Sequence, residues 1–71
     1  MTNTNLLREC IKESGLKQAA IAKKCGFSRQ TLINKIEGRS EFTASDIAII
    51  SKMLSLTPSK RDCIFFANTV E

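Results

Sequence analysis

Three side chains near the middle of the sequence have the types and the spacing that suit hydrogen bonding to nucleic-acid bases. Arg29, Gln30 and Asn34 occupy a stretch of six residues. An arginine fork matches the O6 and N7 acceptors of guanine, and the amides of glutamine and asparagine match N6 and N7 of adenine. On a helix, Gln30 and Asn34 lie one turn apart on the same face. We therefore expect these three residues to contact base edges in a DNA major groove.

Two neighbouring residues extend the expected set of base contacts. Thr31 flanks the polar face and suits a phosphate oxygen or a thymine methyl group. Ile33 lies at the edge of the face, where it would contact a thymine methyl group. The alternative for Ile33 is packing against the loop after Gly38. The five residues predicted to contact bases are Arg29, Gln30, Thr31, Ile33 and Asn34.

A pair of short helices must hold this face outward. Residues 18–25 predict the first helix, in which Ala22 is small enough for two helices to cross closely. Gly26 supplies the positive φ of a tight turn, and Ser28 is a good N-cap for a second helix over residues 28–37. Two helices joined in this way are typical of a helix-turn-helix, whose second helix enters the DNA major groove.

Basic residues are concentrated on the same segment. Residues 15–40 carry six basic and one acidic side chain, a net charge of +5, whereas the rest of the chain carries five basic and six acidic ones. This concentration is typical of a domain that binds a polyanion; the alternative is an ordinary solvated surface. The expected phosphate contacts are the free amide groups at the start of helix 18–25 and the side chains of Lys17, Gln18, Lys35 and Arg39.

The rest of the sequence predicts an all-α fold. Further helices are expected over about residues 5–14, 44–54 and 59–65. Together with the helix-turn-helix they would form one compact five-helix domain over residues 1–71. For residues 66–71 the sequence leaves open whether the tail folds back on the core, frays or exchanges with a second chain.

The fourth helix is apolar on two sides. Ile47, Ile50 and Leu54 form its core stripe, whereas Ile49 and Met53 project from a different side. Either helix 59–65 or a partner subunit must cover that second side. A homodimer interface there would comprise Ile49, Met53, Phe65 and Phe66.

The composition argues against several classes of function. The chain has three widely spaced cysteines and no histidine, so we expect neither a disulfide framework nor a metal site. It has no phosphate-binding glycine loop and no nucleophile motif, so we expect no cofactor and no enzyme activity. No apolar run is long enough to cross a bilayer and no signal-peptide pattern opens the chain, so we expect a cytoplasmic protein with no membrane partner.

The stretch from Leu16 to Leu32, followed by Ile36-Glu37-Gly38, resembles the lambda-repressor-like (Cro/cI-type) helix-turn-helix family. It is also similar to small phage-encoded regulators from prophages of Gram-positive bacteria, and the resemblance extends over about residues 6–66. It implies a five-helix lambda-repressor-like DNA-binding domain and a transcriptional regulator, similar to a Cro-type repressor in the bacterial host cell. It also implies a homodimer on a double-stranded DNA operator with two-fold symmetry.

The resemblance also bears on single residues. The family positions that match Arg29, Gln30 and Asn34 commonly read bases, and the one that matches Gln18 commonly holds a phosphate. Two positions depart from the pattern. Lys17 stands where threonine or serine is usual, and Ala20 where glutamate is frequent, so helix 18–25 is expected to begin without the usual capping box.

A function of a different class competes with DNA binding. The apolar surface of helices 44–54 and 59–65 would also suit a protein-interaction module that binds an antitoxin- or antirepressor-type partner. In that case substitution of Ile49 or Phe66 would abolish function, whereas Arg29→Ala would not.

Overall fold

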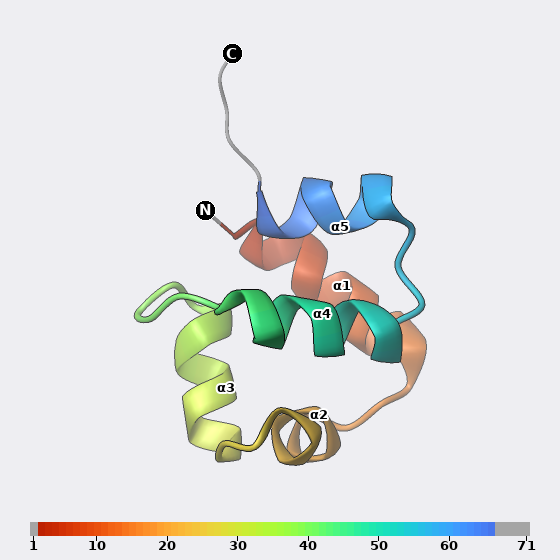
Figure 1. Cartoon of the computed structure of the whole chain (residues 1–71). Coiled ribbons are helices and arrows are strands. Elements are labelled where there is room, and N and C mark those ends of the chain that lie inside the picture. The colour runs from red at the N-terminus through yellow and green to blue at the C-terminus, as the bar shows by residue number, and fades with distance from the viewer. Residues whose placement is uncertain (1, 67–71) are drawn as a thin grey trace.

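The computed structural model describes residues 2–66, and that part of the chain contains five helices and no strand (Figure 1). The prediction of an all-α five-helix fold is confirmed. The question of the tail, which the sequence leaves open for residues 66–71, concerns residues 67–71, and these lie outside the described residues. The helices are α1 (Thr4–Ser14), α2 (Gln18–Cys25), α3 (Arg29–Ile36), α4 (Ala44–Met53) and α5 (Pro58–Phe65).

Local side-chain bonds set where most helices begin. The Ser28 hydroxyl accepts from the Thr31 backbone N–H at 3.1 Å, so α3 begins one residue later than predicted, with Ser28 as its cap. Thr43 and Asp46 form a capping box at the start of α4, since each side chain bonds to the other's backbone N–H. Such bonds satisfy N–H groups that have no partner within the helix.

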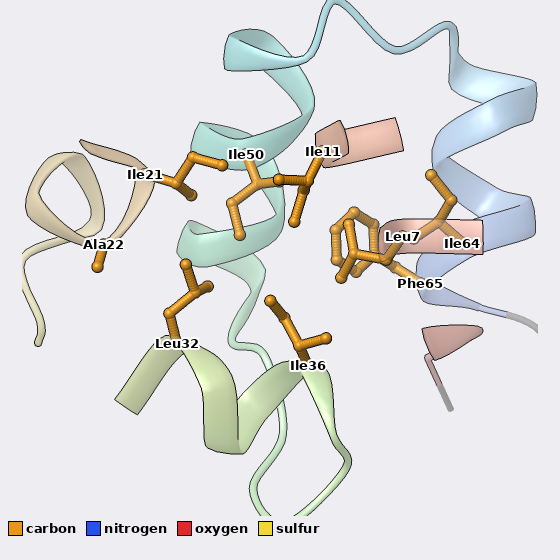
Figure 2. Packing of buried hydrophobic residues seen from close by; sticks show 9 residues of the cluster. All are labelled: Leu7, Ile11, Ile21, Ala22, Leu32, Ile36, Ile50, Ile64 and Phe65. Atoms are coloured by element: carbon orange, nitrogen blue, oxygen red, sulfur yellow. The ribbon is translucent and has the colours of Figure 1, made fainter. Parts of the chain in front are cut away.

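Every helix contributes to one hydrophobic core (Figure 2). In Figure 1, α4 crosses the centre of the molecule, and it contacts both α2 and α5. Ile50 of α4 is 1% exposed and lies in the middle of the cluster. Ala22 is also 1% exposed, as expected of a small residue where α2 packs closely against α3. The core residues are Leu7, Ile11, Ile21, Ala22, Leu32, Ile36, Ile50, Ile64 and Phe65.

The four residues expected at a dimer interface are not equally exposed. Phe65 is only 3% exposed, and its ring packs edge-to-face on Phe42 with 5.3 Å between ring centroids. Met53 is half-buried and packs against the core, and Ile49 is also half-buried. Phe66, in contrast, is 56% exposed. We therefore remove Phe65 from the expected interface, because its ring fills the core of its own chain.

The start of α1 ties together the ends of two other helices. The Asn3 backbone N–H donates to the Ile64 carbonyl at 2.6 Å, and the Thr4 hydroxyl donates to the Ile36 carbonyl at 2.7 Å. The second bond satisfies a carbonyl in the last turn of α3 that has no partner within the helix. The C-terminal end of α3 is thereby held against α1.

Candidate nucleic-acid interface

The turn between α2 and α3 brings the two helices into contact. Gly26 has a φ of +89° and ends α2, and its N–H donates to the Ala22 carbonyl at 2.9 Å. The Phe27 N–H donates to the same carbonyl at 3.1 Å. A positive φ carries little penalty only for glycine, so this residue type is what lets the chain reverse here. Phe27 is half-buried and packs against the core between the helices.

The outward side of α3 carries the polar residues that the sequence singled out. Leu32 and Ile36 point into the core (Figure 2), which turns the other side of the helix outward. Arg29 and Gln30 are exposed, whereas Thr31, Ile33 and Asn34 are half-buried. The Thr31 hydroxyl lies 2.9 Å from the Ser28 hydroxyl. Arg29 forms no ion pair with any other residue between 2 and 66, so its guanidinium group is available to a ligand.

A short polar network joins α3 to the loop that follows it. Gln30 Nε2 donates to Asn34 Oδ1 at 3.2 Å, and Arg39 Nε donates to the same oxygen at 3.3 Å. The Arg39 guanidinium group also pairs with Glu37, whose other carboxylate oxygen pairs with Arg8 of α1 at 3.1 Å. Arg39, an expected phosphate contact, is therefore already bound to two residues at this end of α3.

Lys35 is engaged inside the protein. Its ammonium group donates to Asp46 Oδ2 at 3.2 Å and to the Glu41 carbonyl at 2.8 Å, and the side chain is 12% exposed. The rings of Phe27 and Phe42 lie close by, with centroids 5.3 Å and 6.0 Å from Nζ. We correct the expectation of a phosphate contact at Lys35, because the charge that would attract a phosphate is paired with Asp46.

The Lys35–Asp46 pair affects the pKa of Asp46 itself and of the neighbouring Cys25. Burial by itself would raise the pKa of the Asp46 carboxyl, but hydrogen bonds from Thr43 and from Lys35 outweigh it and lower this pKa. Burial raises the pKa of the Cys25 thiol, the Asp46 charge adds to that rise, and Lys35 opposes it in part. Asp46 is therefore ionised and Cys25 protonated at neutral pH.

Comparison with known proteins identifies the arrangement. A family model described as helix-turn-helix matches residues 7–60. The chain belongs to the lambda-repressor-like (Cro/cI-type) helix-turn-helix family. It is thus a DNA-binding transcriptional regulator, and the family is not an enzymatic one. No curated protein and no solved structure matches the chain.

Within this helix-turn-helix protein, α2 begins without a side-chain cap, as its sequence predicts. Lys17 is the N-cap residue, and the part of the chain that is described supplies no side-chain hydrogen bond to this helix end. Lys17 is exposed and Gln18 is half-buried beside it. Lys23 and Lys24, in the last turn of α2, are exposed as well. Four basic side chains of the motif, those of Lys17, Lys23, Lys24 and Arg29, therefore reach solvent.

Sequence reasoning missed the way in which two residues organise this surface. Glu37 bridges Arg8 and Arg39, and Asp46 fixes Lys35. The sequence indicates Asp46 only as a helix cap, because its position three residues after Thr43 signals that role alone. For Glu37, the one sequence signal of its pairing is that it lies two residues before the oppositely charged Arg39.

Two negative findings apply to residues 2–66. None of the helices found there is long and apolar enough to cross a membrane. In the same range, no three side chains among cysteine, aspartate and glutamate stand close enough together to hold a metal ion.

Proposed function

We propose that this helix-turn-helix protein is a Cro-like repressor encoded by a phage or prophage and active in the cytoplasm of the bacterial host. A homodimer would bind an operator with two-fold symmetry, with one α3 helix in the major groove of each half-site. The observation that carries the proposal is the exposed Arg29, without an ion-pair partner among residues 2–66, beside Gln30 in the first turn of α3. Residues at the start of a recognition helix are those that approach base edges most closely.

Each outward residue of the motif has an expected role. Arg29 donates both arms of its guanidinium group to a guanine, and Gln30 binds an adenine or another base that offers a donor. Thr31 and Ile33, half-buried at the sides of the face, contact a phosphate or a thymine methyl group. These contacts are expected to set which operator sequence is preferred.

Phosphate contacts are assigned to the start of α2. Lys17 is exposed there, and Gln18 and Ala19 lie in the first turn, where backbone N–H groups have no carbonyl partner within the helix. A phosphate bound at this end would supply the acceptor that the missing side-chain cap does not. Lys23 and Lys24 lie at the opposite end of the same helix and serve solubility in this proposal.

The dimer is expected to form around Phe66. This is the large apolar side chain most exposed to solvent among those described, and Ile49 and Met53 of α4 remain half-buried. Exposed aromatic side chains are frequent anchors of protein interfaces. The competing proposal, a module that binds another protein, would use the same residues and leave α3 without a ligand.

The test is selection of bound sequences from a random duplex pool at moderate salt. The wild-type protein should enrich a two-fold symmetric motif with half-site centres about one helical turn apart. Gln30→Ala should flatten the preference at one position of each half-site. Lys24→Ala, which also removes an exposed polar side chain of the motif, is the matched control and should leave the motif intact.

Salt dependence gives a second readout on the selected duplex. If Lys17 and Arg29 of each subunit bring about four positive charges to the duplex, the plot of log affinity against log salt should have a slope of roughly −4 for the dimer. An unenriched pool, together with loss of regulation in Phe66→Ser but not in Arg29→Ala, would favour the protein-binding alternative instead.

A further inference from the structure

The side-chain amide oxygen of Asn34 already accepts two hydrogen bonds within the protein. Gln30 Nε2 and Arg39 Nε both donate to Asn34 Oδ1, at 3.2 Å and 3.3 Å. An amide oxygen has two lone pairs, so it accepts two such bonds and has little capacity for a third. The amide nitrogen, in contrast, keeps its two N–H donors. Asn34 therefore faces a ligand as a hydrogen-bond donor only.

Arg39 is held in this position from three sides. Its backbone N–H donates to the main-chain carbonyl of Asn34 at 2.9 Å, which folds the loop back onto the last turn of α3. Gly38, with a φ of +87°, provides the reversal that this bond requires. The side chain then reaches Asn34 through Nε and Glu37 through Nη2. The backbone and the side chain of Arg39 thus bind the same residue of the recognition helix.

The charge of Arg39 is also compensated in part. Glu37 lies between Arg39 and Arg8 and pairs with both, so one carboxylate is shared by two guanidinium groups. A phosphate that bound Arg39 would have to compete with this carboxylate. Lys17 and Arg29 have no such competitor between residues 2 and 66, and they are the better phosphate and base ligands.

We propose that Arg39 is a positioning residue that fixes Asn34 as a donor and thereby makes this residue reject cytosine. In the major groove adenine offers N7, guanine offers N7 and O6, and thymine offers O4 as acceptors, whereas cytosine offers only its N4 donor. A donor-only Asn34 therefore accepts three bases and excludes the fourth. An unrestrained asparagine would instead favour adenine, because it can use both its oxygen and its nitrogen. The inference rests on the proposed insertion of α3 into the major groove.

The experiment repeats the duplex selection with Arg39→Ala, Arg39→Gln and, as control, Lys17→Ala. The operator position that Asn34 reads is the one at which Asn34→Ala loses its base preference. In the wild type, cytosine should be depleted about fivefold or more at this position. Arg39→Ala should raise adenine at that position, because one of the two acceptor positions of Asn34 Oδ1 becomes free while Gln30 keeps the other. Arg39→Gln keeps an N–H donor without a charge and should retain the exclusion of cytosine. Lys17→Ala should weaken binding to all sequences alike.

Salt dependence separates positioning from a phosphate contact. Removal of a cation that binds a phosphate lowers the salt slope by about one for each phosphate released, and binding weakens uniformly across sequences. The inference is overturned if Arg39→Ala behaves in that way and leaves the base preference unchanged, or if the wild type retains cytosine at the Asn34 position. If the wild type enriches no motif at all, it is the proposed function that fails. Urea unfolding of each variant verifies that an altered preference is not a loss of fold.

Discussion

The ammonium group of Lys35 lies 3.2 Å from Asp46 Oδ2, and the two side chains are only 12% and 10% exposed. This ion pair joins the last turn of the recognition helix α3 to the first turn of α4. Asp46 also accepts from the Thr43 backbone N–H at 3.0 Å, so one carboxylate caps α4 and anchors α3. The orientation of the reading face is thus tied to the helix at the centre of the fold.

Removal of one partner of this pair should destabilise the protein. Asp46→Asn leaves the Lys35 ammonium group near two aromatic rings without its counter-charge, which should lower the free energy of unfolding by about 2–3 kcal/mol. Urea denaturation at neutral pH measures this loss. Asp62→Asn is the control, because the Asp62 side chain is 57% exposed and its pair with Arg61 should contribute little. Equal effects of the two substitutions would contradict the role assigned to Asp46.

The same carboxylate should make stability depend on acid. The pKa of Asp46 is lower in the folded protein than its ordinary value of 3.8. A lowered pKa means that the stabilisation is fully present above the unfolded-state pKa and is lost as the pH falls through the folded-state pKa. The difference in unfolding free energy between wild type and Asp46→Asn should therefore be constant from about pH 7 to 5 and shrink below about pH 4. A difference that stays constant down to about pH 2 would rule out this linkage.

Gly26 should be sensitive to substitution because of its backbone alone. A Cβ atom added at this position meets no atom within 4 Å, so no steric clash with the surroundings is expected. The φ of +89° nevertheless remains unfavourable for alanine, and Gly26→Ala should cost about 1–2 kcal/mol. Gly26→Asn should cost less, because asparagine tolerates the left-handed region better. Thermal unfolding of both variants checks the order, and an asparagine variant less stable than the alanine variant would count against this explanation.

Phe65 and Phe66 offer a comparison of two identical neighbours with opposite exposure. Phe65→Ala empties a buried site and should cost about 3 kcal/mol or more of stability. Phe66→Ala should change the stability of the isolated monomer by less than about 0.5 kcal/mol. If the proposed dimer forms around Phe66, the same substitution should weaken association in sedimentation at rising protein concentration. Unchanged association would remove Phe66 from the interface.

Interactions between residues close in the sequence were predictable. The Ser28 cap, the turn at Gly26 and the Thr43–Asp46 box each depend on groups within four residues, so residue type and spacing suffice to predict them. The weak start of α2 at Lys17 follows from the same local rules. The family match and the helices observed between residues 2 and 66 confirm what these signals indicated about the fold.

Interactions that depend on how helices meet were not predictable. Lys35 has the sequence context of a phosphate ligand, because nothing in its immediate sequence shows that Asp46, eleven positions later, faces it. The apolar run around Phe65 and Phe66 gives no indication of which ring enters the core, since that depends on the angle at which α5 lies on the other helices. Periodicity over a helix of eight residues is too short a signal to settle the question.

The bond between Asn3 and Ile64 has a consequence for how the protein is made. Leu7, on the earliest of the five described helices to leave the ribosome, packs beside Ile64 and Phe65 on the latest of the five (Figure 2). During synthesis, α1 therefore has no cover for this part of its apolar side until α5 has emerged. A nascent chain arrested before Pro58 would expose the side of Leu7 that faces Ile64 and Phe65 to water and to chaperones.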